Sequence, residues 1–240
     1  MHPTVRIRKI SVWIFLVPIV AINMCLLVSV NYEILDNTIF KVDLIGQSGF
    51  TIPYIDGSLS ISRASRTYPQ YLIFKPGMII TSILLIKYWI SNNNLFIEIS
   101  KNPKNNYFLF FGVGAAVFLI AHSIFLGINF ENNLYKFFRT FVLLGFIIFE
   151  IIAQTLLVIN LIKYKNRIEQ FMHKKILFLK ILLVSSLVIV AIFALPILNS
   201  DNYTHFKHAL EWNYFLGVVL FYLLTSLFWR KNPVHTPEGA

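Results

Sequence analysis

The fold follows from residues 107–128, which read YFLFFGVGAAVFLIAHSIFLGI and contain no Asp, Glu, Lys or Arg. A helix needs roughly 20 apolar residues to cross the hydrocarbon core of a bilayer, so this stretch is long enough to span a membrane. Five similar runs occur along the chain, and their continuous rather than alternating pattern favours helices over barrel strands. We therefore predict an all-α polytopic membrane protein, a single six-helix transmembrane bundle with spans at about 11–32, 72–90, 107–128, 138–162, 176–198 and 210–229.

The charged residues lie mostly between these runs. The chain has 21 Lys and Arg against 11 Asp and Glu, a formal net charge of +10. Of the 21 basic residues, 14 fall at the two termini and in the second and fourth connections, and 7 in the others. The positive-inside rule then predicts that both termini are cytoplasmic. Because the charge is spread over short connections, it does not indicate a nucleic-acid partner. The fourth connection, 163–180, either only sets this topology or also binds anionic headgroups.

The longest connection, residues 33–71, is predicted to be a structured outer loop. Apolar residues alternate with charged or polar ones over 40–44 and again over 50–54, and the turn sequence GQSG separates the two segments. This pattern predicts a small β-hairpin, with Pro53 restricting the second strand to a sheet edge. The tail, 232–240, is predicted to be disordered. The single cysteine, Cys25, lies in the first run, so no intrachain disulfide forms.

Glu150 is the most informative single residue. It follows Arg139, at the outer edge of the fourth run, by about 11 residues or ~16 Å of helix, which places it near the bilayer midplane. A carboxyl group at this depth is costly unless it faces the bundle interior with a partner or is protonated. Gln154 shares its helix face. The two residues either belong to a polar cavity that binds a proton or a headgroup, or hold helices together by hydrogen bonds.

A second group of polar residues lies at the start of the last run. His205, His208 and Glu211 recur at intervals of three residues, and His122 near the end of the third run could approach them. Such a set could bind a metal ion or perform acid–base catalysis. The spacing matches no recognised metal signature, and the sequence favours hydrogen bonding of these residues to headgroups or loops. No cofactor is indicated.

The outer loop supplies further candidates. Ser60 and Ser62 offer hydroxyl groups, but no Gly-x-Ser-x-Gly elbow surrounds them. Arg63 and Arg66 could grip a phosphate at the outer leaflet, or could simply be solvated. The chain also lacks a phosphate-binding Walker loop, a dinucleotide fingerprint and a His-Glu-x-x-His motif.

Several short motifs together resemble one family. They are SLSIS at 58–62, YPQYLIF at 68–74, His122, ALEW at 209–212 and FYLLT at 221–225. Their order resembles the six-span family that joins the damage-regulated autophagy modulators, the FGF-receptor-activating protein and the Golgi factor that remodels GPI-anchor lipids. The resemblance implies six spans with cytoplasmic termini, and a role in lipid handling or membrane-protein regulation. By analogy, the fold or site would depend on Ser60, Ser62, Pro69, Gln70, His122 and Glu211.

Three functions remain open from the sequence. The first is non-enzymatic binding of membrane lipids, or of a membrane-protein partner, through the outer loop and a polar intramembrane cavity. The second is an intramembrane lipid hydrolase or acyl transferase, which requires at least two of His122, Glu150, His208 and Glu211 to converge. The third is a proton-coupled transporter built around Glu150. The sequence favours the first and leaves the identity of the membrane open.

Overall fold

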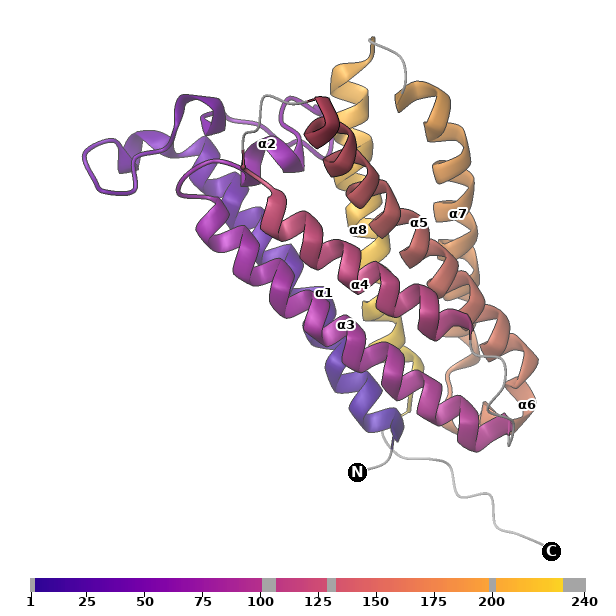
Figure 1. Cartoon of the computed structure of the whole chain (residues 1–240). Helices are drawn as coiled ribbons and strands as arrows, with labels where there is room; N and C mark the ends of the chain where they lie inside the picture. Colours follow the sequence, from indigo (N-terminus) through magenta and orange to yellow (C-terminus); the bar gives the residue numbers. More distant parts are fainter. Residues whose placement is uncertain (1–2, 101–106, 129–132, 199–201, 231–240) are drawn as a thin grey trace, which may run out of the picture.

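The computed structural model describes residues 3–100, 107–128, 133–198 and 202–230, and within them it is an all-α membrane bundle (Figure 1). Six helices are long and apolar enough to cross a membrane, which confirms the predicted fold class. They are α1 (Pro3–Val30), α3 (Tyr71–Ser100), α4 (Tyr107–Phe125), α5 (Asn133–Lys163), α7 (Lys174–Leu198) and α8 (Thr204–Phe228). The predicted tail, 232–240, lies outside the described residues.

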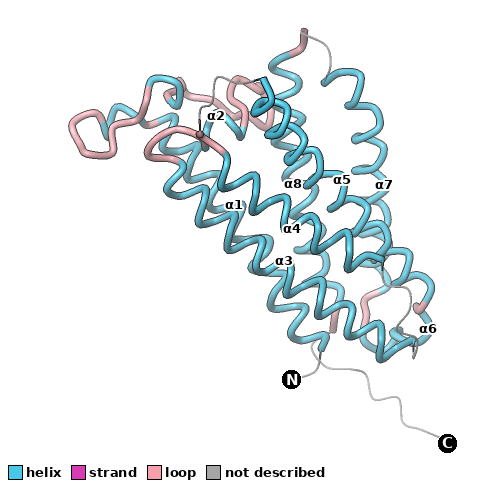
Figure 2. Tube along the Cα trace, in the orientation of Figure 1, coloured by secondary structure: helices cyan, strands magenta, loops and turns pink. Residues whose placement is uncertain are grey.

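The six helices form a closed ring of neighbours. Contacts run from α1 to α3, α4, α5, α7 and α8 in that order, and α8 packs back against α1 (Figures 1 and 2). We call the end at which α1 begins and α8 ends the terminal end. The opposite end, which carries residues 31–70, is the loop end. Because every polar residue on the inner face of such a ring is shielded from lipid, the interior can hold groups that the flanks cannot.

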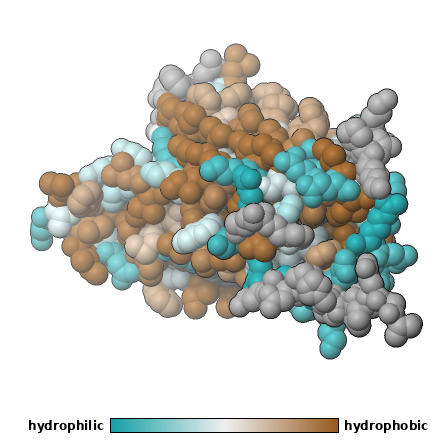
Figure 3. Space-filling view, turned by 90° about the horizontal axis from the view of Figure 1, so that it is seen from below, coloured by the Kyte–Doolittle hydropathy of each residue, from teal (hydrophilic) through white to brown (hydrophobic). Residues whose placement is uncertain are grey.

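The flanks of the bundle are apolar. Large hydrophobic side chains such as Trp13 of α1, Phe110 of α4 and Phe193 of α7 are exposed on its outside. Figure 3, which views the molecule from the terminal end, shows hydrophobic side chains over much of the surface. Such a surface suits hydrocarbon rather than water, which agrees with an integral multipass protein.

The interior is filled largely by aromatic side chains. Tyr88 and Trp89 of α3 and Tyr222 of α8 are fully buried and pack edge to face, with the two tyrosine ring centroids 5.0 Å apart. Gly112 of α4 makes room for this packing, because a Cβ atom there would lie 2.3 Å from the Trp89 ring. Close helix approach over a small residue is the usual way to pack helices in lipid.

The predicted β-hairpin in the outer loop is wrong. Residues 31–70 contain the 3₁₀ turns η1 (Tyr32–Leu35) and η2 (Leu44–Gly46) and the short helix α2 (Ile61–Ser65), with no strand among them. A half-buried hairpin needs one apolar face against a core, and here both Leu44 and Phe50 are exposed. The loop backbone bonds instead to its surroundings: Ser48 N–H donates to the Ser29 carbonyl of α1 at 3.0 Å.

Candidate functional site

The first residues of α8 hold the outer loop against the bundle, and we call this contact the loop clasp. His208 Nδ1 lies 2.9 Å from the Gly57 carbonyl oxygen, and Trp212 Nε1 donates to the Leu59 carbonyl at 2.7 Å. The next residue along α8, Asn213, donates through Nδ2 to the Tyr54 carbonyl at 2.7 Å. Each α8 side chain therefore binds a backbone carbonyl of the loop that has no helix or sheet partner.

Glu211 takes part in the same clasp through the start of α2. The first N–H groups of a helix have no partner within it. Ser60 is the N-cap of α2, and its side chain accepts a hydrogen bond from Arg63 N–H at 3.1 Å. The carboxylate of Glu211 lies against the N–H groups of Ile61 and Ser62, which act as its hydrogen-bond donors. The two side chains thus complete the helix terminus between them.

This geometry gives the predicted catalytic and metal candidates at α8 a structural role. His208 and Glu211 are both engaged with loop backbone, and the side chain of His205 is exposed. Within the described ranges, no group of three or more His, Cys, Asp or Glu could hold a metal ion. The weak metal candidates His205, His208 and Glu211 are therefore not assembled into a site.

Gln70, predicted to bind a ligand, is also part of the scaffold. It is fully buried just before α3, and its amide lies 3.2 Å from both Ser29 Oγ of α1 and Thr67 Oγ1. The carbonyl oxygen of Gln70 lies 3.4 Å from the thiol of Cys25. The cysteine is buried and free, and with Ser29 it joins the end of α1 to the start of α3.

A different group, the arginine cluster, lies at the loop end between α2, α4 and α5. It consists of Arg63, Arg66 and Arg139. Arg63 is exposed and donates to the Ile45 carbonyl at 2.9 Å. Arg66 is half-buried: burial, together with the positive charges of Arg139 and Arg63, lowers its pKa. Like charges held this close repel one another, so the cluster favours an anion.

His122 lies next to this cluster, at the last turn of α4. It is buried, its ring packs edge to face on Phe74 with centroids 6.4 Å apart, and the charge of Arg139 acts on it. Its Nδ1 atom has no hydrogen-bond partner. Buried polar atoms are nearly always paired, so an unpaired nitrogen on a ring that feels the charge of Arg139 is a feature that requires an explanation.

No described carboxylate neutralises the arginine cluster. No ion pair joins Arg63, Arg66 or Arg139 to an acidic residue that the structure describes. Asp56 is used within the loop, where hydrogen bonds from Ser58 N–H and the Thr51 hydroxyl lower its pKa to about 2. The carboxylate of Glu211 faces the backbone N–H groups at the start of α2. The positive charge at this end of the bundle is therefore left uncompensated by these acids.

The buried polar core is the third group, and it contains Glu150 and Gln154. Glu150 faces the ring interior and is buried, and its Oε1 accepts hydrogen bonds from Tyr222 and, at 2.9 Å, from Gln154 Nε2. Gln154 also donates to the Val218 carbonyl of α8 at 3.3 Å. Glu150 Oε2, Gln154 Oε1 and the Tyr214 hydroxyl have no partner. The carboxyl group thus bonds α5 to α8 while retaining unused hydrogen-bonding capacity.

Lys180 belongs to this core, and its assignment to the fourth connection is wrong. It lies on α7, fully buried, and its Nζ donates to Thr225 Oγ1 of α8 at 2.6 Å. The ammonium group also lies 3.8 Å from the Phe221 ring centroid, within the range of a cation–π contact. The signal was present in the sequence, because the apolar run 176–198 includes this lysine. A lysine inside an apolar run faces the interior unless it can reach the interface.

Glu150 and Lys180 are linked through α8 rather than paired directly. No ion pair joins them, and they contact Tyr222 and Thr225, one turn apart on α8. The hydroxyl of Tyr88 lies 3.3 Å from Thr225 Oγ1, and its ring packs on that of Tyr222. An acidic and a basic side chain thus share one aromatic interior across three helices, separated by hydroxyl groups.

The four predicted catalytic candidates do not converge. Within the part of the chain that the structure describes, no hydrogen bond joins any two of His122, Glu150, His208 and Glu211. His122 lies by the arginine cluster, Glu150 in the buried polar core, and the other two in the loop clasp. A general base must reach its proton directly or through one water, so the structure does not assemble an acid–base pair from these four.

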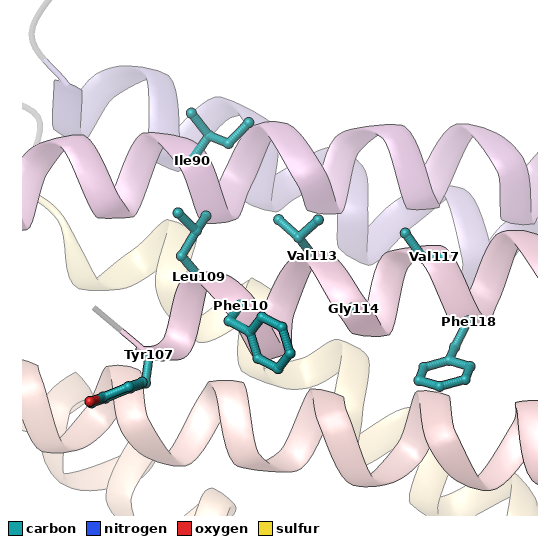
Figure 4. A pocket seen from close by; sticks show the side chains of 8 residues that line it. All are labelled: Ile90, Tyr107, Leu109, Phe110, Val113, Gly114, Val117 and Phe118. Carbon is teal, nitrogen blue, oxygen red and sulfur yellow. The ribbon is translucent and has the colours of Figure 1, made fainter. Parts of the chain in front are cut away.

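An apolar groove of about 780 Å³ runs along the outside of α3 and α4 (Figure 4). Ile90 of α3 lies over Leu109 and Val113 of α4 in this view, and Tyr107 and Phe118 mark its ends. The groove lies on a flank of the bundle and is open. It suits an acyl chain, because its lining has almost no hydrogen-bonding group.

In comparisons with known proteins, no family model, no curated protein and no solved structure matches this chain. The resemblance to the six-span family of lipid-remodelling and autophagy-modulating proteins therefore stays a prediction.

Proposed function

We propose that this protein binds membrane lipid with an anionic headgroup, through Arg66 and Arg139 at the loop end. The observation that carries the proposal is the positive charge of the arginine cluster, which no carboxylate among the described residues compensates, together with the unpaired Nδ1 of the buried His122. Arginine is well suited to this role, because its planar fork donates two parallel hydrogen bonds to a phosphate.

The depth of the cluster favours a lipid over a free anion. Arg66 precedes α3, Arg139 follows the start of α5, and His122 lies one turn before the end of α4. All three positions are near the end of a membrane-spanning helix, where phosphate headgroups lie. The acyl chains would then rest on the apolar flanks. The predicted orientation, with both termini cytoplasmic, puts this cluster at the outer or luminal leaflet.

The test is lipid retention. The protein is reconstituted in nanodiscs of mixed phosphatidylglycerol and phosphatidylcholine, and the lipids that remain on it after transfer to mild detergent are identified by mass spectrometry. The expected result is enrichment of phosphatidylglycerol on the wild type and its loss in the Arg66→Gln/Arg139→Gln variant. Each hydrogen bond to a charged group contributes about 1.5–3 kcal/mol, so each arginine should change the retention constant by about tenfold or more.

The matched control is Lys163→Gln, which removes one positive charge from the terminal end. It should retain phosphatidylglycerol as the wild type does. Equal loss in this control would mean that only net charge matters, and an unchanged double arginine variant would overturn the proposal.

A second candidate function, proton-coupled transport, is supported by one observation: the unpartnered Oε2 of Glu150 in the membrane interior. Proteoliposomes carrying a pH-sensitive dye test it. The wild type should dissipate a pH gradient faster than Glu150→Gln, and equal rates would remove this function. The enzyme hypothesis gains no support, since its candidate residues lie in three separate clusters.

A further inference from the structure

The outer loop carries a set of apolar side chains that nothing described in the chain covers. Five of them, which we call the apolar tip, are Ile34, Ile39, Leu44, Phe50 and Ile55, with exposed fractions of 76, 81, 84, 87 and 80%. A single exposed hydrophobic residue is normal on a protein surface, but an apolar set in one segment marks an interaction surface. These five lie between residues 34 and 55, outside the spans.

The apolar tip is held in place rather than loose. Asp43 N–H donates to the Tyr68 carbonyl at 3.2 Å, and Tyr68 Oη donates to the Ile39 carbonyl at 2.8 Å. Asp56 closes the other side of the segment by accepting from Ile52 N–H at 2.8 Å. These hydrogen bonds fix the backbone of the segment, and its apolar side chains point outward from it.

The position of the segment identifies what covers it. Figure 1 shows the first part of the segment, which follows α1, extending sideways from the ends of α1 and α3, beside the bundle rather than over its centre. The part around Tyr54 returns to α8, whose Asn213 donates to the Tyr54 carbonyl. The lipid-facing side of α1 leads directly into the segment, since Met24 and Leu27 are also exposed. The apolar tip thus continues the hydrocarbon-facing flank of the bundle around its loop end.

Residues at the base of the segment are those of a membrane interface. Tyr71 opens α3, and Lys75 Nζ lies 5.3 Å from its ring centroid while also donating to the Ile124 carbonyl at 3.2 Å. Lys41 is exposed beside the tip. Aromatic rings and lysines whose stems lie along apolar surface are typical of the headgroup level.

We propose that the apolar tip inserts into the interface of the leaflet at the loop end, so that the outer loop is a membrane-anchored element. This contact is independent of the arginine cluster, because it needs apolar lipid surface rather than an anionic headgroup. It would hold the loop in the plane of the membrane, at the level at which Arg66 meets a phosphate.

The experiment measures the surroundings of a dye at single positions in the full-length protein. Cys25 is replaced by Ala, and an environment-sensitive fluorophore is attached at Leu44→Cys or Phe50→Cys in phosphatidylcholine nanodiscs. Both positions are exposed, so neither label removes packing. Asn37→Cys, an exposed polar position in the same segment, is the matched control. Lipid with a spin label near the headgroup and aqueous iodide serve as the two quenchers.

Insertion predicts that labels at 44 and 50 emit at shorter wavelength than the label at 37. They should also be quenched by the spin-labelled lipid and be several-fold less accessible to iodide. Emission and iodide quenching equal to those at 37 would overturn the proposal. Protection from both quenchers would also overturn it, since a second protein would then cover the tip. Because phosphatidylcholine is zwitterionic, failure here leaves the anionic-lipid proposal untouched.

Discussion

Glu211→Gln should release the outer loop from α8, because glutamine has one acceptor oxygen where glutamate has two, and it cannot carry a negative charge. The carboxylate of Glu211 faces the N–H groups of Ile61 and Ser62. The amide oxygen of glutamine can serve one of them, while its NH₂ group would face the other donor. The loss is at least one charge-assisted hydrogen bond, about 1.5–3 kcal/mol. The open population of the loop should therefore rise about 10- to 150-fold.

Hydrogen exchange followed by mass spectrometry measures this opening directly, since local opening exposes the amides of residues 54–66 without unfolding the bundle. Ser60→Ala should also raise the exchange rate of the same peptide, but by less. The loss of an N-cap side chain lowers stability by about 0.5–2 kcal/mol. The loss of loop stability in the Ser60→Ala/Glu211→Gln double variant should be smaller than the sum of the two single losses, because both side chains bind the same helix terminus. His205→Gln, an exposed position on the same helix, should exchange as the wild type does. Wild-type exchange in Glu211→Gln would refute the clasp.

Three further changes probe other parts of the molecule. Gly112→Ala should lower the unfolding temperature in detergent, because its Cβ would lie 2.3 Å from the Trp89 ring and overpacking costs about 1–3 kcal/mol. Thr225→Val should destabilise the bundle by a similar amount, since it removes the oxygen to which Lys180 Nζ donates and takes this hydrogen bond from a fully buried amino group. The pKa of Asp56 is about 2 in the folded loop, below its ordinary value of 3.8, so loop exchange protection should be complete above about pH 4. It should fall as the pH drops through 2, and Asp56→Asn should remove this dependence.

Matched variants separate these effects from general damage. Gly49→Ala adds the same methyl group into open space and should leave the unfolding temperature unchanged. Thr155→Val removes a hydroxyl that bonds only within its own helix, to the Ile151 carbonyl, and should be nearly neutral. Equal destabilisation in Gly112→Ala and Gly49→Ala, or in the two threonine variants, would contradict the packing and core hydrogen bonds described above.

The spans were predictable because lipid imposes one rule on the whole segment: a run such as 107–128 without charge has to form a helix that satisfies its own backbone. The outer loop obeys no such rule. Alternation over 40–44 and 50–54 was interpreted as a hairpin, but alternation predicts a strand only when one face is buried against protein. Here Phe50 and Ile52 are exposed while Thr51 and Pro53 on the opposite face are buried, so the apolar face is not the one that packs against protein. The backbone of the loop is bonded instead to α1, α2 and α8.

The role of individual polar residues was the least predictable part, because the sequence does not show whether a polar side chain stabilises the fold or binds a ligand. His208 and Glu211 suggested catalysis or metal binding from their spacing, and in the structure they bind loop backbone that has no other partner. Because these side chains bind the loop, no carboxylate among the described residues pairs with Arg66 or Arg139. The arrangement that fastens the loop is thus also what leaves the loop end electropositive, and this is why we look for the ligand at the arginines rather than at the histidine–glutamate pair.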